Sequence, residues 1–362
     1  MIRYILVFLL VAHGVAHLVG FVVPWRLIMS AEMPYRTTIL QGRVDLADVG
    51  IRAYGLVWLA LAFGCAVIAI GVLLRSSWWL AALEGLVAVS LVFCVLDWPL
   101  TRMGVVANLL ILVMAFAAVR FNGGAMALRN PDLERIWAGV PRQAGSLTLN
   151  GRPLVTHAIA PGTAPASAVL LKMHGEIKLG RWFPFTAQEV ILDDGTFIWA
   201  ATVSMFGMPV LGSDRLVNGA GSMSWKMFDL FPVAAAAGPE ITRSAIGRSV
   251  AEMVAWLPSV LSGPSVKWTE SGVTIARYGE STLVAMNLDE RGGLKTVHLP
   301  RWGNPDGAAY GYTEFGVIVD QERTFGAYTI PSKLRAGWFF GTERFEREGE
   351  FFRATIGSVE IK

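Results

Sequence analysis

Four long apolar segments occupy the N-terminal part of this chain of 362 residues and restrict what it can fold into. They lie near residues 4–24, 51–74, 77–97 and 103–120. A helix needs about 20 predominantly apolar residues to cross the hydrocarbon core of a bilayer. Arg3 precedes the first segment, as in a signal peptide, but no small-residue cleavage pattern follows it. We therefore expect four retained transmembrane helices.

The composition changes after the fourth segment. The whole chain is 54% hydrophobic and 16% charged, whereas soluble domains carry about 25% charged residues. The deficit of charge is confined to the N-terminal part. We expect a four-span transmembrane domain at 1–125, a connector at 126–168 and a soluble domain at 169–362.

Charge and cysteine usage exclude several classes of protein. The net charge of +3 comes without a basic cluster that contains aromatic residues, so no nucleic-acid partner is expected. Both cysteines, Cys65 and Cys94, lie in apolar segments. The sequence therefore has no disulfide framework and no cysteine metal site.

The soluble part has the alternation of β-strands. In LLKMHGEIKLG, residues 170–180, apolar and polar side chains alternate, and in EVILDDGTFIWAATV, residues 189–203, two strand-like runs flank an Asp-Gly turn. No alternation of strands and helices appears, so the sheet should be antiparallel. One helix is expected over 243–261, ending near Pro258, and a shorter one over 222–231.

These elements predict the fold class. The chain should be a multidomain membrane protein, with a four-helix transmembrane bundle followed by a mainly antiparallel β domain that contains one or two helices. Many antiparallel strands with so few helices favour a half-barrel, a curved sheet around a helix. Its concave face must be filled by a helix or by a ligand.

His13, His17 and Glu84 lie inside the apolar segments, whereas Asp97 lies at the end of one. The two histidines are four residues apart and share one helix face, and Glu84 lies within about 5 Å of the depth of His13. A contact between His13 and Glu84 would spare the carboxylate from lipid. The three residues could form a structural polar clasp, a metal or haem site that uses His13 and His17, or a proton-relay or quinone-like site.

The soluble part contains no recognisable catalytic motif. Arg248 and Glu252 are four residues apart on the expected helix, where they could form a simple salt bridge. Alternatively, Arg248 faces the concavity and anchors a carboxylate or phosphate head group. The tryptophans Trp182, Trp199 and Trp256 either pack the core or line a lipid-binding pocket.

Short patterns along most of the chain support a family resemblance. They are His13-Gly14-x-x-His17-Leu18-x-Gly20-Phe21, Gly55-Leu56-Val57-Trp58, Trp78-Trp79, Trp98…Gly104…Asn108, Trp182-x-Pro184-Phe185-x-Ala187-Gln188, Trp199-x-Ala201, Asp214…Gly219-x-Gly221-x-Met223, Arg248-x-x-x-Glu252, Trp256-x-Pro258 and Ile330-Pro331…Trp338. The chain resembles an uncharacterised bacterial membrane-protein family with a domain of unknown function. This chain departs from the family in its third loop, where Leu100-Thr101 replaces an Asp-Ala pair.

The resemblance implies a β domain similar in outline to the half-barrels of lipoprotein carriers, which bind acyl chains. It also implies an extracytoplasmic β domain. The arginines flanking the four segments favour the opposite side, because five lie on the side of the N-terminus and four on the other. The charge count thus favours a cytoplasmic β domain by a small margin.

Three functions are compatible with these observations. The first is membrane-tethered, non-enzymatic binding of a lipid or another hydrophobic ligand, with Arg248, Glu252, Trp182, Trp199 and Trp256 as binding residues. The second is a membrane-embedded metal or redox enzyme, or a proton relay, at His13, His17 and Glu84. The third is a structural or assembly factor for other membrane proteins. A multi-pass location in the plasma (inner) membrane is expected, and the sequence identifies no cofactor.

Overall fold

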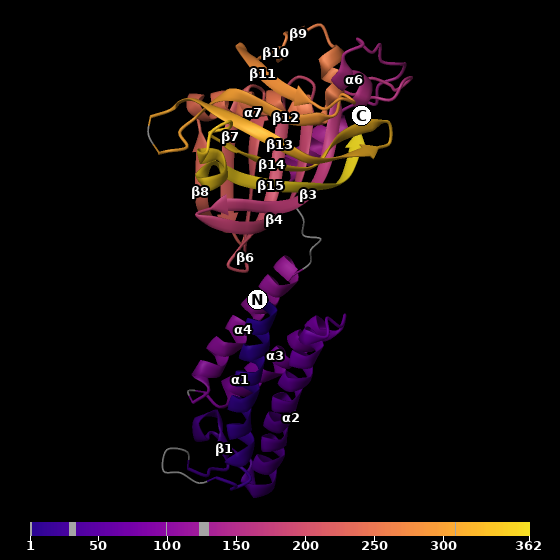
Figure 1. Ribbon diagram of the computed structural model, residues 1–362. Coiled ribbons are helices and arrows are strands. Elements are labelled where there is room, and N and C mark those ends of the chain that lie inside the picture. Colours follow the sequence, from indigo (N-terminus) through magenta and orange to yellow (C-terminus); the bar gives the residue numbers. More distant parts are fainter. Residues whose placement is uncertain (1, 29–33, 99, 123–129, 308) are drawn as a thin grey trace. The chain divides into compact units, whose positions relative to one another are not determined.

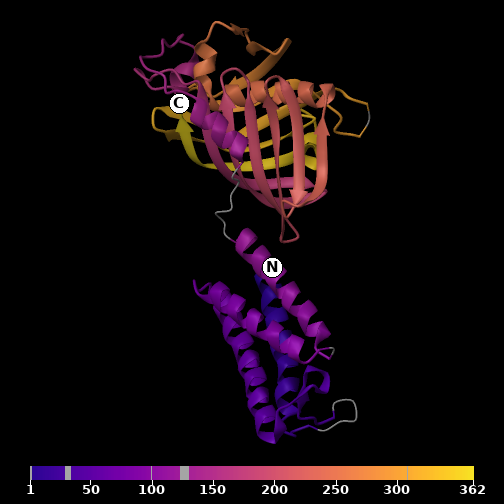
Figure 2. The same ribbon diagram turned by 180° about the vertical axis from the view of Figure 1, so that it is seen from behind.

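The computed structural model describes residues 2–28, 34–98, 100–122, 130–307 and 309–362. The chain divides into two compact units, Met1–Met126 and Ala127–Lys362, which we call the membrane unit and the β domain. Figures 1 and 2 show the helices of the first unit and the large sheet of the second from opposite sides. Each unit has its own buried residues.

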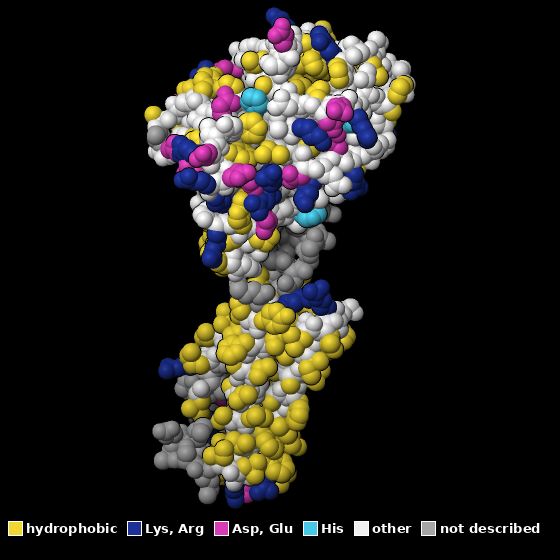
Figure 3. Space-filling view, viewed as in Figure 1, with side chains coloured by type: hydrophobic (Ala, Val, Ile, Leu, Met, Phe, Trp, Pro, Cys, Tyr) yellow, Lys and Arg dark blue, Asp and Glu magenta, His cyan; other side chains and the backbone are white. Residues whose placement is uncertain are grey.

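The membrane unit consists mainly of long apolar helices. They are α1 (Ile2–Val22), α2 (Ala47–Leu73), α3 (Trp79–Leu96) and α4 (Arg102–Asn122). All four are long and apolar enough to span a membrane, so the four predicted helices are confirmed. Many of their outward side chains are also hydrophobic, as the face of this unit in Figure 3 shows. A helix that is apolar all round suits lipid better than water. Two short strands, β1 (Thr38–Ile39) and β2 (Val44–Asp45), flank the turn η1 (Leu40–Gly42) before α2.

Small residues let α1 approach α2 closely. A Cβ atom at Gly14 would lie 2.9 Å from the Cβ of Cys65, and one at Gly20 would overlap the indole of Trp58. Glycine is used in this way where membrane helices pack, because it lets the backbones come together. The buried face of α1 therefore includes Gly14 together with His13 and His17.

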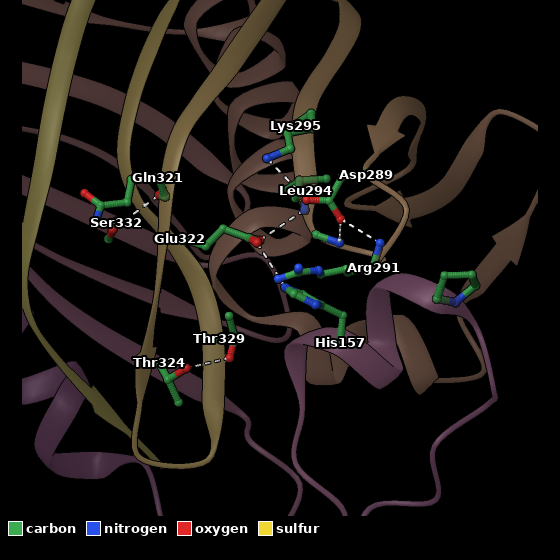
Figure 4. Close-up of polar contacts among 12 residues, drawn as sticks. His157, Asp289, Arg291, Leu294, Lys295, Gln321, Glu322, Thr324, Thr329 and Ser332 are labelled. Atoms are coloured by element: carbon green, nitrogen blue, oxygen red, sulfur yellow. Dashed lines mark hydrogen bonds and ion pairs between the residues drawn. The ribbon is translucent and has the colours of Figure 1, made fainter.

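The stretch before the sheet packs against the β domain. Helix α5 (Pro131–Gly139) begins at Asn130, whose side chain accepts hydrogen bonds from the backbone amides of Asp132 and Leu133. Helix α6 (Pro153–Ala158) contributes to the main core, and Figure 4 shows His157 hydrogen-bonded to Glu322 of β13 (Gly311–Phe325), at 3.0 Å. Both helices lie within the predicted connector over 126–168, whose residues 126–129 are outside the described part.

A thirteen-stranded antiparallel sheet dominates the described part of the β domain. Its order is β8-β7-β6-β5-β4-β3-β15-β14-β13-β12-β11-β10-β9. Besides β13, the strands are β3 (Ala168–Leu179), β4 (Arg181–Leu192), β5 (Phe197–Met205), β6 (Met208–Val217), β7 (Ala220–Met227), β8 (Phe231–Ala237), β9 (Val266–Trp268), β10 (Gly272–Arg277), β11 (Glu280–Leu288), β12 (Leu294–Gly303), β14 (Tyr328–Trp338) and β15 (Glu350–Ile361). The short helical turns η2 (Pro258–Ser262) and η3 (Phe345–Gly349) complete the described elements.

The sheet curves around one helix, α7 (Pro239–Trp256). Strands β7 and β12 are far apart in the sheet order, yet both contact α7, so the sheet must bend around it. Figure 2 shows α7 across the strands. The main core lies between this helix and the concave face, where Val250, Met253 and Leu299 are almost completely buried. The predicted half-barrel filled by a helix is confirmed.

One predicted helix is wrong. Residues 222–231 form part of β7, a turn and the start of β8. Ser222, Ser224 and Lys226 alternate with apolar residues in this stretch, and β7 pairs with strands on both sides. Period-two alternation and sheet pairing thus prevail over the local helical pattern.

Candidate functional site

A cavity of about 150 Å³ lies between α7 and the concave face of the sheet, and we call it the α7 cavity. Most of its lining is apolar or aromatic, with a few charged groups. The lining residues are Ile177, Glu189, Trp199, Asp214, Arg248, Ala251, Glu252, Ala255, Trp256, Arg301, Phe315, Val317, Leu334, Ala336, Phe351 and Phe352. An apolar wall with a few convergent polar groups is typical of small-molecule sites.

Helix and strand periodicity place the charged groups at this cavity. Arg248 and Glu252 are one turn apart on α7. On the sheet, Trp199 of β5 pairs directly with Glu189 of β4 on one side and with Asp214 of β6 on the other. Directly paired residues share one face of a sheet, so this row of three presents two carboxylates and an indole to α7.

The guanidinium of Arg248 is surrounded by three carboxylates. Its Nε donates to Glu252 at 2.6 Å, and its two terminal nitrogens donate to Glu189 at 3.0 Å and to Asp214 at 3.3 Å. Only 1% of the Glu189 side chain and 17% of the Arg248 side chain are exposed. Arg248 therefore faces the cavity, as one sequence interpretation predicted, but each of its three nitrogens already donates to a carboxylate of the protein.

Burial and neighbouring charges change the acidity of this cluster. Burial raises the pKa of Glu189 well above its usual value, and the Glu252 carboxylate raises that pKa further, although Arg248 opposes both effects. Burial lowers the pKa of Arg248, but Glu252, Glu189 and Asp214 outweigh it and the net pKa is raised. Arg248 thus stays charged, and Glu189 is the member of the cluster whose ionisation costs most.

Arg301 of β12 is the second guanidinium at the cavity, and the sequence analysis did not identify it. Its Nε donates to the carbonyl of Ser244 at 3.1 Å, and it lies over the rings of Phe315 and Trp338, at 4.8 and 5.2 Å from their centres. Burial and the charge of Arg248 lower the pKa of Arg301 to about 10, so it remains a cation at neutral pH. Among the described residues, no carboxylate forms an ion pair with it.

The alternation within β12 is the signal that could have identified Arg301. It shares a strand face with Leu299, which is buried in the core. An arginine at a core-facing position needs a partner, since a buried polar group without hydrogen bonds is costly.

Two further polar atoms at the cavity lack partners within the described residues. Nε1 of Trp199 and Oε2 of Glu252 are buried, and neither has a hydrogen-bond partner there. Buried polar groups in native proteins are nearly always paired. Trp199, Glu252 and Arg301 therefore all line one cavity, and each has a polar group that could form a further hydrogen bond.

A comparison with protein-family models matches residues 154–347 to the family of unknown function DUF6544. The matched stretch is more than half of the chain and contains α7 and most of the strands around it. The chain belongs to this family. The matched region includes every charged residue of the α7 cavity, and only Phe351 and Phe352 of its lining lie beyond it.

Comparisons with solved structures match the β domain at low similarity. A domain named for outer membrane lipoprotein sorting, from Vibrio parahaemolyticus, has 8% identity and a TM-score of 0.28, and the match covers 54% of this chain and 86% of that one. A LolA superfamily protein from Nitrosomonas europaea has 6% identity and a TM-score of 0.27, with 55% and 86% covered. Structures with TM-scores this low do not indicate which ligand the DUF6544 region binds. A search of curated proteins found no match.

The structure brings four of the five predicted binding residues of the DUF6544 region together. Arg248, Glu252, Trp199 and Trp256 all line the α7 cavity, where Nε1 of Trp256 donates to the carbonyl of Pro331 at 3.1 Å. Trp182 lies elsewhere, with the guanidinium of Arg353 4.2 Å from the centre of its ring. Its role as a binding residue is not supported by this placement.

In the membrane unit, the two histidines lie side by side. Their ring centres are 4.2 Å apart, and both rings are buried. Their partners are Asn108, 3.2 Å from Nε2 of His13, and Ser90, 3.3 Å from Nε2 of His17.

The structure does not bring His13 and Glu84 together, although their similar depth made a contact feasible. Glu84 is exposed on α3, and the buried polar residue of that helix is Ser90. Similar depth in the bilayer did not place Glu84 on the face of α3 that meets α1. Within the described residues, no three His, Cys, Asp or Glu side chains gather where they could hold a metal ion.

Proposed function

We propose that the β domain binds a lipid-like amphiphile in the α7 cavity and that it does so without catalysing a reaction. The observation that carries this proposal is the convergence of unpaired donors on an apolar cavity. The Nε1 of Trp199 has no partner among the described residues, and the Arg301 guanidinium has no carboxylate partner there. A carbonyl or carboxylate of a ligand would accept hydrogen bonds from both.

The apolar wall supports a ligand with a hydrocarbon part. Phe315, Phe351 and Phe352 line the cavity together with alanine and leucine side chains. A volume of about 150 Å³ is comparable to that of an apolar cavity that holds a benzene-sized molecule. The cavity therefore suits the polar end and the first carbons of an alkyl chain, and the rest of a long chain would extend beyond it.

The membrane unit supports a membrane setting for this activity. A chain with four spans keeps its β domain near the bilayer, and lipid is the most abundant amphiphile there. We infer residence in the plasma (inner) membrane, with a bilayer lipid or its fatty acid as the ligand.

Photolabelling of the full-length protein in nanodiscs tests the proposal. A palmitic acid with a diazirine in its chain is added, and labelled peptides are mapped by mass spectrometry. We expect labels on α7 and on β14–β15 around the cavity. In Arg301→Met the labelling should fall by about tenfold, because a charge-assisted hydrogen bond is lost.

Arg323→Met is the matched control, because Arg323 is exposed on β13 and does not line the cavity. Labelling around the cavity should be unchanged in this variant. Labels confined to the transmembrane helices, or equal cavity labelling in Arg301→Met and wild type, would contradict the proposal.

A further inference from the structure

The membrane unit contains a second and larger cavity, which we call the bundle cavity. Its volume is about 710 Å³, and its lining comes from all four helices and the loop after α1. His13, His17 and Trp58 line it, as do Tyr54 and Asp97 near one end of the helices. The cavity is thus amphipathic, and it lies wholly within a unit that spans the membrane.

The polar groups behind the histidines form a chain of hydrogen bonds. Oδ1 of Asn108 can only accept, so Nε2 of His13 donates to it at 3.2 Å. Nδ2 of Asn108 then donates to Oγ of Ser90 at 2.8 Å. The Ser90 hydroxyl lies 3.3 Å from Nε2 of His17 and completes the chain when it donates to that nitrogen.

With Ser90 as the donor to His17, the outer ring nitrogens of both histidines have defined roles. Because Nε2 of His13 carries the proton, Nδ1 of His13 is an acceptor, and because Nε2 of His17 accepts, Nδ1 of His17 carries a proton and is a donor. Neither Nδ1 has a hydrogen-bond partner among the described side chains and backbone. The two neighbouring rings therefore present one acceptor and one donor, which a single ligand hydroxyl could satisfy together.

The depth of the histidines in the membrane makes a charged head group beside them unfavourable. His13 lies halfway along α1, a helix of 21 residues, and so about 15 Å from either end. A charge at that depth is costly. The charged groups that line the cavity pair with each other: Arg36 lies 3.8 Å from Asp97, which also accepts a hydrogen bond from the Tyr54 hydroxyl at 2.9 Å.

An aromatic side chain flanks the hydrogen-bonding pair. The indole of Trp58 is 4% exposed, and its centre lies 5.1 Å from that of the His17 ring. Flat rings pack well against such a surface. The site therefore suits an uncharged, planar ring that carries oxygen atoms, with an apolar tail for the remaining volume.

We propose that the bundle cavity binds an isoprenoid quinone or quinol, with a ring oxygen between His13 and His17. The quinol hydroxyl donates to Nδ1 of His13 and accepts from Nδ1 of His17, whereas a quinone carbonyl uses the His17 donor alone. The quinol should therefore bind more tightly than the quinone. This site is separate from the α7 cavity and does not depend on it.

Titration of the full-length protein in nanodiscs with decylubiquinone and with its reduced form tests this proposal. Binding should be saturable, and tighter for the quinol. Ala107→Phe fills the cavity from α4, and we expect it to abolish binding. Val106→Phe is the matched control, because Val106 is 55% exposed on the same helix and does not line the cavity.

His17→Phe keeps a ring of similar size and removes the donor. We expect it to weaken binding of both forms about tenfold, as the loss of one buried hydrogen bond does. If Ala107→Phe does not fold, His17→Phe still tests the proposal. No saturable binding to wild type, or affinities unchanged in Ala107→Phe or His17→Phe, would overturn the proposal, as would a bound phospholipid that decylubiquinone fails to displace.

Discussion

At the scale of single residues, the two arginines of the α7 cavity have different roles. Arg248 is held by Glu189, Asp214 and Glu252 and organises the polar side of the cavity. Arg301 rests on aromatic rings and keeps its terminal donors for another partner. Of the two, the arginine that sequence spacing singled out is the structural one.

Removal of Arg248 should destabilise the β domain strongly. Breaking a buried ion pair by deleting one partner costs about 3–5 kcal/mol, because the other charge remains buried. In Arg248→Met three carboxylates would lose the cation with which they form ion pairs. Thermal unfolding followed by tryptophan fluorescence should show a large fall in Tm, whereas Arg323→Met should unfold close to wild type. A Tm for Arg248→Met within the error of wild type would refute this account of the cluster.

Glu189 should make stability depend on pH. Burial and the Glu252 carboxylate raise its pKa in the folded state. A carboxyl group with a raised folded pKa gives its full stabilisation below its unfolded pKa, about 4.3, and loses it as the pH rises towards the folded pKa. Glu189→Gln cannot ionise, so it should avoid this loss.

We therefore expect the Tm of Glu189→Gln relative to wild type to increase between pH 4.5 and pH 7.5. Thermal melts across that range measure the difference. If the Tm of Glu189→Gln and the Tm of wild type changed with pH in the same way, Glu189 would not titrate as its burial requires.

At the scale of elements, the closeness of β3 and β15 depends on one glycine. Gly175 pairs with Ala354, and a Cβ atom at Gly175 would overlap the carbonyl oxygen of Arg353. Gly357 lies in β15 of the same strand pair, but a Cβ atom there would be 3.6 Å from the nearest backbone oxygen. Both glycines belong to the same pair of strands, but only the position of Gly357 has room for a methyl group.

Gly175→Ala should therefore lower the Tm of the β domain more than Gly357→Ala. The first substitution must push apart two central strands, while the second makes an ordinary van der Waals contact. Thermal unfolding of both variants compares them directly. Equal Tm values would mean that the ladder relaxes at no cost around Gly175.

Much of the element pattern was predictable from sequence, and the exceptions have physical reasons. Long apolar runs identify the four spans, and alternation identifies strands such as β3 and the pair around Asp194-Gly195. The helical prediction at 222–231 was wrong because long-range strand pairing decides that segment. The position of a residue along its span gives its depth in the membrane, but not the direction in which its side chain points around the helix. The sequence therefore could not identify the partners of His13.

The partners of the histidines were also inconspicuous in the sequence. Asn108 belongs to one of the short family patterns, but nothing in the sequence identifies it or Ser90 as a hydrogen-bond partner of His13 or His17. Arg301 escaped notice for a related reason. The alternation of β12, which places it on the same strand face as the buried Leu299, is the signal that could have identified it.

At the scale of the whole molecule, we expect all four helices to cross the membrane, which would return the chain to the side on which α1 begins. The loop between α2 and α3 then lies on the same side as the β domain, and the loop before α2 lies on the opposite side. Ser77 and Val44 are exposed in these two loops, and Ser358 is exposed on β15.

Single-cysteine labelling tests this topology in a background where Cys65 and Cys94 are replaced by serine. A membrane-impermeant maleimide applied to one side should label Ser77→Cys and Ser358→Cys together. Val44→Cys should react only from the other side. Joint labelling of Val44→Cys and Ser358→Cys would contradict four complete spans.

The central claim is that the α7 cavity holds an amphiphile. The most direct measurement is an experimental density map of the full-length protein purified with its native lipids. The account predicts continuous density from Arg301 and Trp199 along Phe351 and Phe352. A cavity that contains only ordered water, or is closed by its own side chains, would contradict it.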